Sequence, residues 1–359
     1  MAKKVAIIGT VGLPANYGGF ETLVEHVTKE LHEDFNITVY CSSKSYSEKL
    51  GTYNNCKLHY INLEANGIQS ILYDIRSILH ALKYADVLLI LGVSGCIIIP
   101  FIKFFSKKKI IVNIDGLEWK RQKWNRFAKW FLKLSERFAV KGADIIIGDN
   151  RVIQDYVKQN YDKKAHLIAY GGDHCIARPI SKKTFKKYPF LNTKYAFKVC
   201  RIEPENNIEM ILEGFSKEDN LPLVIIGNWN NSAFGKHMKL LYRDFKHLHL
   251  LNPIYNQDVL NEIRSNCYVY IHGHSAGGTN PSLVEAMCLK LPVLVFDVKY
   301  NRATTQNQAL HFSNAEQLVE LTCNLNDTII HDNAKKMEII AQKKYSWHKI
   351  IKSYKSIIE

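Results

Sequence analysis

The chain has 359 residues, of which 47% are hydrophobic and 23% charged, and a formal net charge of +14 at pH 7. This composition excludes a disordered chain, and the length favours two domains over one core. The eight cysteines are scattered without a Cys-x-x-Cys pair, which argues against a disulfide or metal framework and favours a reducing cytosol. The positive charge leaves nucleic acid, anionic lipid and polyanionic substrates open as partners.

The first half of the chain alternates short apolar segments with amphipathic ones, a pattern typical of a parallel sheet covered by helices on both faces. It enters its first apolar segment directly, without the apolar core and cleavage site of a signal peptide. The expected strands are residues 5–8, 37–41, 58–63, 87–91, 110–114, 144–148 and 165–169. The expected helices are residues 19–31, 68–84, 125–140 and 151–159.

Residues 87–105 are almost continuously apolar and long enough to cross a bilayer. However, Gly92, Gly95 and Pro100 interrupt the run, and Lys103 lies inside it. We therefore expect a buried strand, a glycine-containing turn and a short apolar helix rather than a membrane span.

Basic and aromatic side chains alternate between residues 101 and 133. At helical spacing, Trp124, Phe127, Phe131 and Leu134 share one face. This pattern suits the surface of an anionic bilayer, and it equally suits a helix packed on the core with a solvated basic face. It would also suit single-stranded nucleic acid, but no RNP-like, zinc-finger or helix-turn-helix pattern accompanies it, so we expect no nucleic-acid partner.

The second half repeats the alternation after a lysine-rich segment, residues 178–195, which we expect to connect two domains. Two Rossmann-like halves result, and such folds bind ligands beyond the carboxyl ends of their strands. The expected strands are residues 195–200, 223–226, 247–251, 269–272 and 293–296. The expected helices are residues 207–215, 234–242, 257–265 and 282–288, with a last amphipathic helix after Ser346.

The strongest functional signal is a Gly-rich loop between the strand at 269–272 and the helix that follows it. Successive backbone N–H groups and the helix start favour an anion there, and a carboxylate one turn into the helix suits sugar hydroxyls. A site for a phosphate next to a site for sugar hydroxyls indicates that the ligand is a nucleotide sugar. The alternative is a tight turn that needs glycine only for its geometry. The donor-binding candidates are His272, His274, Gly277, Gly278, Thr279, Asn280 and Glu285.

The loop after the first strand is not Gly-x-Gly-x-x-Gly, and the second strand does not end in an acidic residue. These two features disfavour a nicotinamide-dependent dehydrogenase. Gly18 and Gly19 instead open a helix and offer a second place for close approach of a ligand to the backbone, or a flexible turn.

Three further side chains follow predicted strands. Arg201 is placed to neutralise a leaving diphosphate, or else forms a surface ion pair. Asp115 and Glu118 either orient or deprotonate an acceptor hydroxyl, or cap a helix. The chain has no Asp-x-Asp pair to hold Mg²⁺ or Mn²⁺, so we expect a transferase that needs neither metal nor cofactor.

The opening motif, Gly12-Leu13-Pro14-Ala15-Asn16-Tyr17-Gly18-Gly19-Phe20-Glu21-Thr22, is similar to that of bacterial rhamnosyltransferases of capsule and cell-wall synthesis. With Gly277-Gly278-Thr279-Asn280-Pro281-Ser282-Leu283-Val284-Glu285, it makes the chain resemble the family-four glycosyltransferases of GT-B fold. The resemblance implies an α/β protein with two Rossmann-like domains whose parallel sheets face a central cleft. It implies an acceptor domain at 1–177, a nucleotide-sugar domain at 178–343 and a helix at 344–359 crossing back to the first domain.

The resemblance also implies a retaining transfer of L-rhamnose from dTDP-rhamnose to a lipid-linked saccharide. The enzyme would be cytoplasmic and peripheral at the inner face of the plasma membrane, with the segment 101–133 on anionic lipid. Arg201, Gly278, Thr279 and Asn280 would hold the diphosphate, Glu285 the ribose, and Gly18 and Gly19 would lie near the reacting centre. The acceptor candidates are Tyr17, Phe20, Glu21, Asp115 and Glu118.

Two positions depart from the family pattern. Gly277 stands where the first glutamate of its Glu-x7-Glu motif is expected, and Asn206 stands where a lysine follows the arginine. Another nucleotide sugar, linked to UDP or GDP, a GT-B sugar-nucleotide epimerase and a basic module that binds nucleic acid or membranes remain the alternatives.

Overall fold

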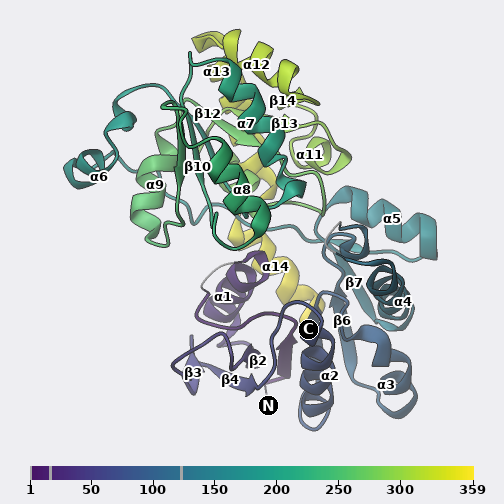
Figure 1. The fold of residues 1–359 in the computed structure, drawn as a ribbon. Coiled ribbons are helices and arrows are strands. Elements are labelled where there is room, and N and C mark those ends of the chain that lie inside the picture. The colour runs from purple at the N-terminus through teal and green to yellow at the C-terminus, as the bar shows by residue number, and fades with distance from the viewer. Residues whose placement is uncertain (1, 16–17, 122–123) are drawn as a thin grey trace. The chain divides into compact units, whose positions relative to one another are not determined.

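A computed structural model describes residues 2–15, 18–121 and 124–359. Internal contacts divide the chain into two compact units. The first comprises Met1–Tyr170 with Trp347–Glu359, and the second comprises Gly171–Ser346. Each is built on one sheet with helices packed against it (Figure 1).

The sheet of the first unit has the strand order β3-β4-β2-β1-β5-β6-β7-β8. Its pairings are parallel apart from the short antiparallel pair β3–β4. The strands are β1 (Lys4–Ile8), β2 (Asn36–Ser42), β3 (Thr52–Tyr53), β4 (Cys56–Ile61), β5 (Val87–Leu91), β6 (Lys109–Asn113), β7 (Ile145–Gly148) and β8 (His166–Leu167). The α-helices are α1 (Gly19–Leu31), α2 (Gln69–Ala81), α3 (Ile99–Phe105), α4 (Arg126–Gly142), α5 (Arg151–Tyr161) and α14 (Trp347–Ile358).

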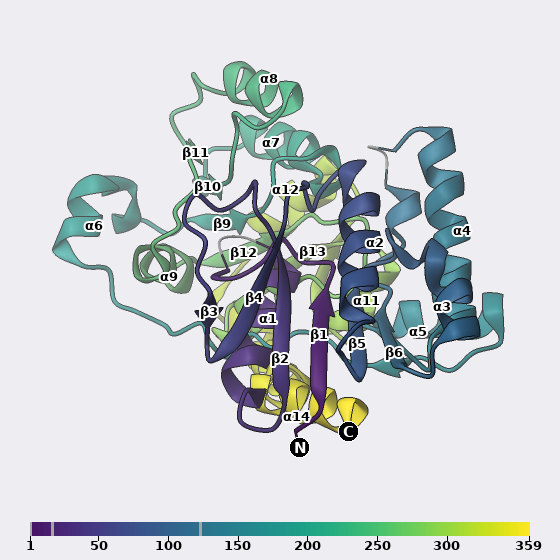
Figure 2. The same cartoon turned by 90° about the horizontal axis from the view of Figure 1, so that it is seen from below.

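Helix α14 belongs to the first unit, where it lies beside α1 (Figures 1 and 2). Trp347 stacks on His26 with ring centroids 3.9 Å apart. Tyr354 is fully buried, and its hydroxyl accepts a hydrogen bond from Asn113 Nδ2 at 3.2 Å. The apolar stripe predicted for the last helix is therefore a buried face that completes the core of this unit.

The second unit has a six-stranded parallel sheet in the order β11-β10-β9-β12-β13-β14. The strands are β9 (Ala196–Val199), β10 (Leu223–Ile226), β11 (Leu248–Leu251), β12 (Val269–His272), β13 (Val293–Phe296) and β14 (Leu310–Phe312). The α-helices are α6 (Lys182–Lys187), α7 (Ile208–Lys217), α8 (Ala233–Leu241), α9 (Gln257–Ser265), α10 (Pro281–Cys288), α11 (Lys299–Thr304), α12 (Ala315–Cys323) and α13 (Asp327–Lys344).

The lysine-rich segment 178–195 is part of the second unit and not a linker, contrary to the sequence prediction. It contains α6, whose cap residue Ser181 donates to Glu262 Oε2 on α9 at 2.9 Å. The division between the units comes earlier, at Tyr170 and Gly171, and Gly172 N donates to the carbonyl of Tyr345 at 2.9 Å within the second unit.

The apolar run at 87–105 folds as expected, into β5, a 3₁₀ helix at Cys96–Ile98 and α3. Within the described ranges, no helix is both long enough and apolar enough to span a bilayer.

The sequence left open whether the aromatic face of α4 is packed on the core, and the structure buries other residues. Phe127 is 73% exposed, and Leu132, Ser135, Glu136, Ala139 and Val140 are buried instead. A polar anchor lies on the buried face: the carboxylate of Glu136 accepts hydrogen bonds from Trp119 Nε1 at 2.8 Å and from the hydroxyls of Tyr156 and Tyr161, each at 2.6 Å. These hydrogen bonds, made by donors from other segments of the unit, help to fix the orientation of the helix.

Candidate functional site

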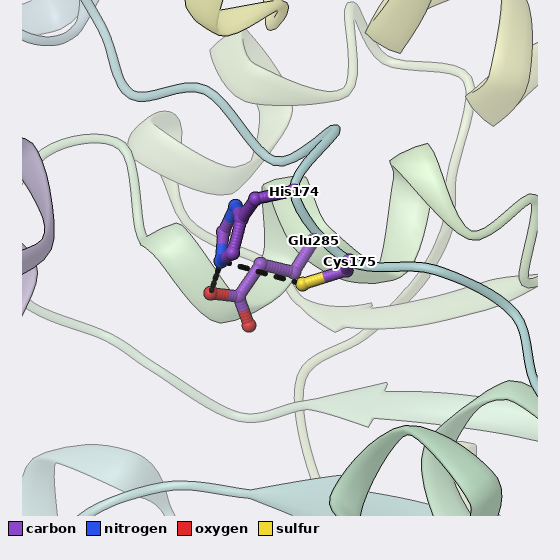
Figure 3. Close-up of side chains that lie close together, drawn as sticks. All are labelled: His174, Cys175 and Glu285. Carbon is purple, nitrogen blue, oxygen red and sulfur yellow. Dashed lines mark hydrogen bonds and ion pairs between the residues drawn. The ribbon is translucent and has the colours of Figure 1, made fainter. Parts of the chain in front are cut away.

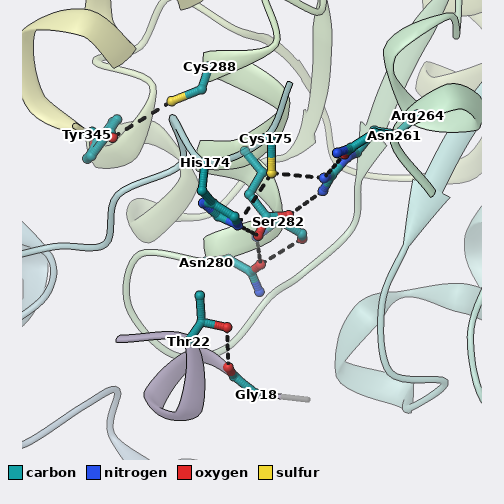
Figure 4. A network of polar contacts seen from close by, with 11 residues as sticks. Gly18, Thr22, His174, Cys175, Asn261, Arg264, Asn280, Ser282, Cys288 and Tyr345 are labelled. Atoms are coloured by element: carbon teal, nitrogen blue, oxygen red, sulfur yellow. Dashed lines mark hydrogen bonds and ion pairs between the residues drawn. The ribbon is translucent and has the colours of Figure 1, made fainter. Parts of the chain in front are cut away.

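The Gly-rich loop links β12 to α10 in the second unit, as predicted. Gly277 adopts a φ of 99°, in the left-handed region that favours glycine. Asn280 is the N-cap of α10, because its Oδ1 accepts hydrogen bonds from Ser282 N at 3.0 Å and Ser282 Oγ at 2.8 Å (Figure 4). The side-chain oxygen of Asn280 thus holds the helix start, which leaves the expected diphosphate contact to its other atoms.

Glu285 lies one turn into α10 and is held from two sides. Its Oε2 pairs with the guanidinium of Arg264 from α9, and its Oε1 lies 3.5 Å from His174 Nε2. Arg264 is only 1% exposed and also donates to Asn261 Oδ1 at 2.7 Å and Cys175 Sγ at 2.9 Å. Sequence reasoning missed both Arg264 and His174, and the one available signal was a charged residue on the buried face of α9.

The surroundings of Glu285 set its charge. Burial raises the pKa of its carboxyl, but Arg264 and His174 outweigh burial and bring that pKa below the usual glutamate value. Glu285 is therefore a carboxylate at neutral pH, and it can only accept hydrogen bonds.

His174, Cys175 and Glu285 have potential metal ligands within 4.8 Å of one another (Figure 3). However, Arg264 contacts both Cys175 and Glu285, and burial raises the pKa of the Cys175 thiol so that it keeps its proton. A guanidinium in the ligand shell and a protonated thiol both oppose a cation. These side chains therefore fit an ion-pair network better than a metal site.

His272 and His274 differ in their surroundings. His272 is 2% exposed, and neither ring nitrogen has a hydrogen-bond partner among the described residues. Burial, with help from Lys198, brings its pKa well below the usual value, so the ring is neutral. His274 is half-buried, and its Nδ1 lies 3.0 Å from Asn206 Oδ1.

Asn206, which stands where the family pattern has a lysine, connects two loops. Its Nδ2 donates to the carbonyl of Arg201 at 2.8 Å, while its Oδ1 faces His274. Ser275 N also donates to the carbonyl of Glu205 at 2.9 Å. The loop after β9 and the Gly-rich loop are thus bonded together, and the exposed Arg201 side chain lies on the first of them.

The first unit contains the other candidates. Glu21 is 7% exposed, and its Oε1 accepts hydrogen bonds from Thr10 Oγ1 at 2.9 Å and Val11 N at 2.7 Å, so it supports the loop after β1. Gly18 has a φ of 138°, and a Cβ there would lie 1.8 Å from Glu21 Oε2, so only glycine fits. Gly18 O accepts from Thr22 Oγ1 at 3.0 Å (Figure 4), Phe20 is partly buried, and Tyr17 lies outside the described residues.

The two carboxylates predicted for the acceptor follow β6. Asp115 has a φ of 56°, and its N–H donates to Asn113 Oδ1 at 3.0 Å. Glu118 accepts from Arg121 at 3.1 Å through Oε2 and from Trp124 Nε1 at 3.0 Å through Oε1. Both oxygens of Glu118 are thus already hydrogen-bonded.

Two parallel-sheet α/β units, with the last helix packed on the first unit, define a GT-B fold. Sucrose-phosphate synthase from Thermosynechococcus elongatus has the same fold, with a TM-score of 0.83 at 13% identity over 99% of this chain and 98% of that one. Anabaena HepE in complex with UDP-glucose has a TM-score of 0.77 at 11% identity over 100% of this chain and 99% of that one.

Sequence comparison adds matches to two family models. Residues 180–345 match the group 1 glycosyl transferases, and residues 2–173 match a domain of unknown function, DUF1972. An uncharacterized glycosyltransferase of Methanocaldococcus jannaschii, MJ1069, is 22% identical over 95% of both chains. The glycosyltransferase 1 domain-containing protein 1 of Xenopus tropicalis is 27% identical over 32% of this chain, a match that spans only 33% of that protein. The chain is a GT-B glycosyltransferase with a group 1 domain in its second half.

Proposed function

We propose that this glycosyltransferase moves L-rhamnose from dTDP-rhamnose to a hydroxyl of a lipid-linked saccharide, with retention of anomeric configuration, in capsule or cell-wall polysaccharide synthesis. The observation that carries the donor half of this proposal is Glu285, an ionised carboxylate one turn into a helix that follows a Gly-rich loop. A ribose offers hydroxyl donors to such a carboxylate, and the helix start favours the attached diphosphate.

In this proposal, the diphosphate contacts the backbone of residues 277–280 and the guanidinium of Arg201. With Asn206 at the position of the family lysine, Arg201 takes the larger share of the leaving charge. Backbone N–H groups that are already in place cost no reorganisation when that charge develops.

We assign the acceptor to the first unit. Asp115 and Glu118, which both follow β6, are the candidates to orient its hydroxyl. Rhamnose is favoured because residues 12–22 are similar to the opening of bacterial rhamnosyltransferases. A UDP-linked sugar is the second candidate, since HepE, a protein of the same fold, was solved with UDP-glucose.

A product assay tests the proposal. The protein is incubated with dTDP-rhamnose or with UDP- and GDP-sugars, with and without a lipid-linked saccharide, and products are identified by mass spectrometry. We expect a glycosylated lipid from dTDP-rhamnose and none without acceptor. Conversion of a sugar nucleotide in the absence of acceptor would indicate an epimerase instead.

We further propose that the enzyme works at a membrane surface through an aromatic face on α3 and α4, two helices that pack together in the first unit (Figure 2). Its members are exposed by 60% to 82%: Phe101, Phe104, Phe105, Phe127 and Trp130. Lys107 and Arg126 are exposed beside them in the sequence. Bulky apolar side chains next to basic ones suit an anionic bilayer, where each basic residue contributes about 1 kcal/mol.

Replacing Phe104, Phe105 and Trp130 together by serine should weaken binding to vesicles with anionic phospholipid at least about tenfold, because each buried aromatic ring contributes about 1.5–3 kcal/mol. Cosedimentation measures the effect. The control is Leu240→Ser with Leu241→Ser on α8, which removes exposed apolar side chains of the second unit and should change nothing. Equal binding of wild type and the triple variant would contradict the membrane assignment.

A further inference from the structure

Arg264 is a charged side chain built into the interior of the second unit. At 1% exposure it lies among the buried residues of α9, directly after the buried Ile263. Burying a guanidinium is costly unless its donors are satisfied by well-placed acceptors.

The contacts of Arg264 converge on three segments (Figure 4). One terminal nitrogen pairs with Glu285 Oε2 on α10, and the other donates to Asn261 on its own helix and to Cys175 on the segment after Gly171. A planar guanidinium can donate to these separate acceptors at the same time. A lysine ammonium is a single point charge and cannot reproduce this arrangement of donors.

Several ionisable groups face Glu285. They are Arg264 from α9, His174 and Cys175 from the segment after Gly171, Tyr270 from β12 and Cys288 on α10 itself. Burial raises the pKa of both thiols and of the phenol, so these three are neutral. Arg264 is thus the permanent positive charge that faces the Glu285 carboxylate.

We propose that Arg264 is a positioning residue for the donor: it fixes the carboxylate of Glu285 through Oε2 and thereby presents Oε1 as the acceptor for the ribose hydroxyls. This inference rests on the proposed function, because it assumes that Glu285 meets the ribose. Arg264 itself touches no substrate in this arrangement and acts through Glu285 alone.

The test is the affinity of dTDP and UDP, measured by calorimetry from pH 5 to pH 8 on wild type, Arg264→Met and Arg264→Lys. Without the guanidinium, His174 alone is left to oppose burial, so the pKa of Glu285 rises and the carboxyl takes up a proton as the pH falls. We expect Arg264→Met to bind at least about tenfold more weakly at pH 5 and to recover partly by pH 8. Arg264→Lys keeps the positive charge, so its affinity should fall without acquiring this pH dependence.

A double-mutant cycle separates positioning from a merely structural role. If Arg264 acts through Glu285, adding Arg264→Met to Glu285→Gln should cost no further affinity. Additive losses, or a variant that binds as wild type at every pH, would overturn the inference. If Arg264→Met does not fold, Asn261→Ala removes one anchor of the guanidinium and should weaken nucleotide binding with kcat unchanged; unaltered affinity would again overturn it. Failure of wild type to bind either nucleotide would instead refute the proposed function.

Discussion

Replacing Arg201 by alanine should lower kcat by about two orders of magnitude, the effect of removing one preorganised donor from a developing negative charge. Arg201 is exposed on the loop after β9, and Asn206 ties its carbonyl to the Gly-rich loop through His274. Asn206 stands where the family pattern has a lysine, and it carries no charge. Arg201 would therefore neutralise the diphosphate without a second positive charge from that position. Steady-state kinetics with saturating donor measure the loss.

Arg243→Ala is the matched control. Arg243 is also an exposed arginine of the second unit, but it pairs with its neighbour Asp244 at 3.5 Å and follows α8, outside the candidate site. It should retain wild-type kcat, which separates a local role of Arg201 from a general effect of lowering the positive charge. Full activity of Arg201→Ala would show that another group meets the leaving diphosphate.

Replacing Glu285 by glutamine should raise the donor KM about a hundredfold. The substitution keeps the shape of the side chain but replaces charged acceptors by a neutral amide, and each hydrogen bond to a charged group contributes about 1.5–3 kcal/mol. Initial rates over a range of donor concentrations measure the change. A donor KM equal to that of wild type would mean that Glu285 is only the structural partner of Arg264.

The same variant makes a prediction about stability. The pKa of Glu285 is depressed in the folded state, so its contribution to stability is present above the unfolded pKa and is lost as pH falls through the folded value. The difference in Tm between wild type and Glu285→Gln should therefore be largest near neutral pH and shrink in acid. Glu338→Gln, which removes a partner from the surface pair with Lys290 at 2.8 Å, should change Tm little at any pH.

Periodicity and turn chemistry were sufficient to predict most of the fold. The bounds predicted for α1, α9, β10, β12 and β13 coincide with those of the structure. A lysine-rich surface, however, made residues 178–195 resemble a linker, although Ser181 and Glu262 anchor them to the second unit. The sequence also left open which face of α4 is buried, because the anchor at Glu136 uses tyrosines from another helix.

Only the part of the candidate site that lies in and directly after the Gly-rich loop could be predicted from the sequence. The Gly-rich loop and Glu285 are adjacent in sequence, so the sequence alone indicates a phosphate site next to a carboxylate for sugar hydroxyls. Arg264 and His174 reach Glu285 from segments that are distant along the chain, and only folding brings these side chains together. Glu21 and Asn280 have structural contacts that their motifs do not reveal: Glu21 Oε1 accepts from Thr10 and Val11, and Asn280 Oδ1 caps α10.

A crystal structure of the protein with dTDP or UDP tests the central claim most directly. We predict the diphosphate on the backbone of residues 277–280 with Arg201 beside it, and the ribose hydroxyls on Glu285 Oε1 while Oε2 stays on Arg264. A nucleotide bound elsewhere in the second unit, or a ribose that makes no contact with Glu285, would contradict the account.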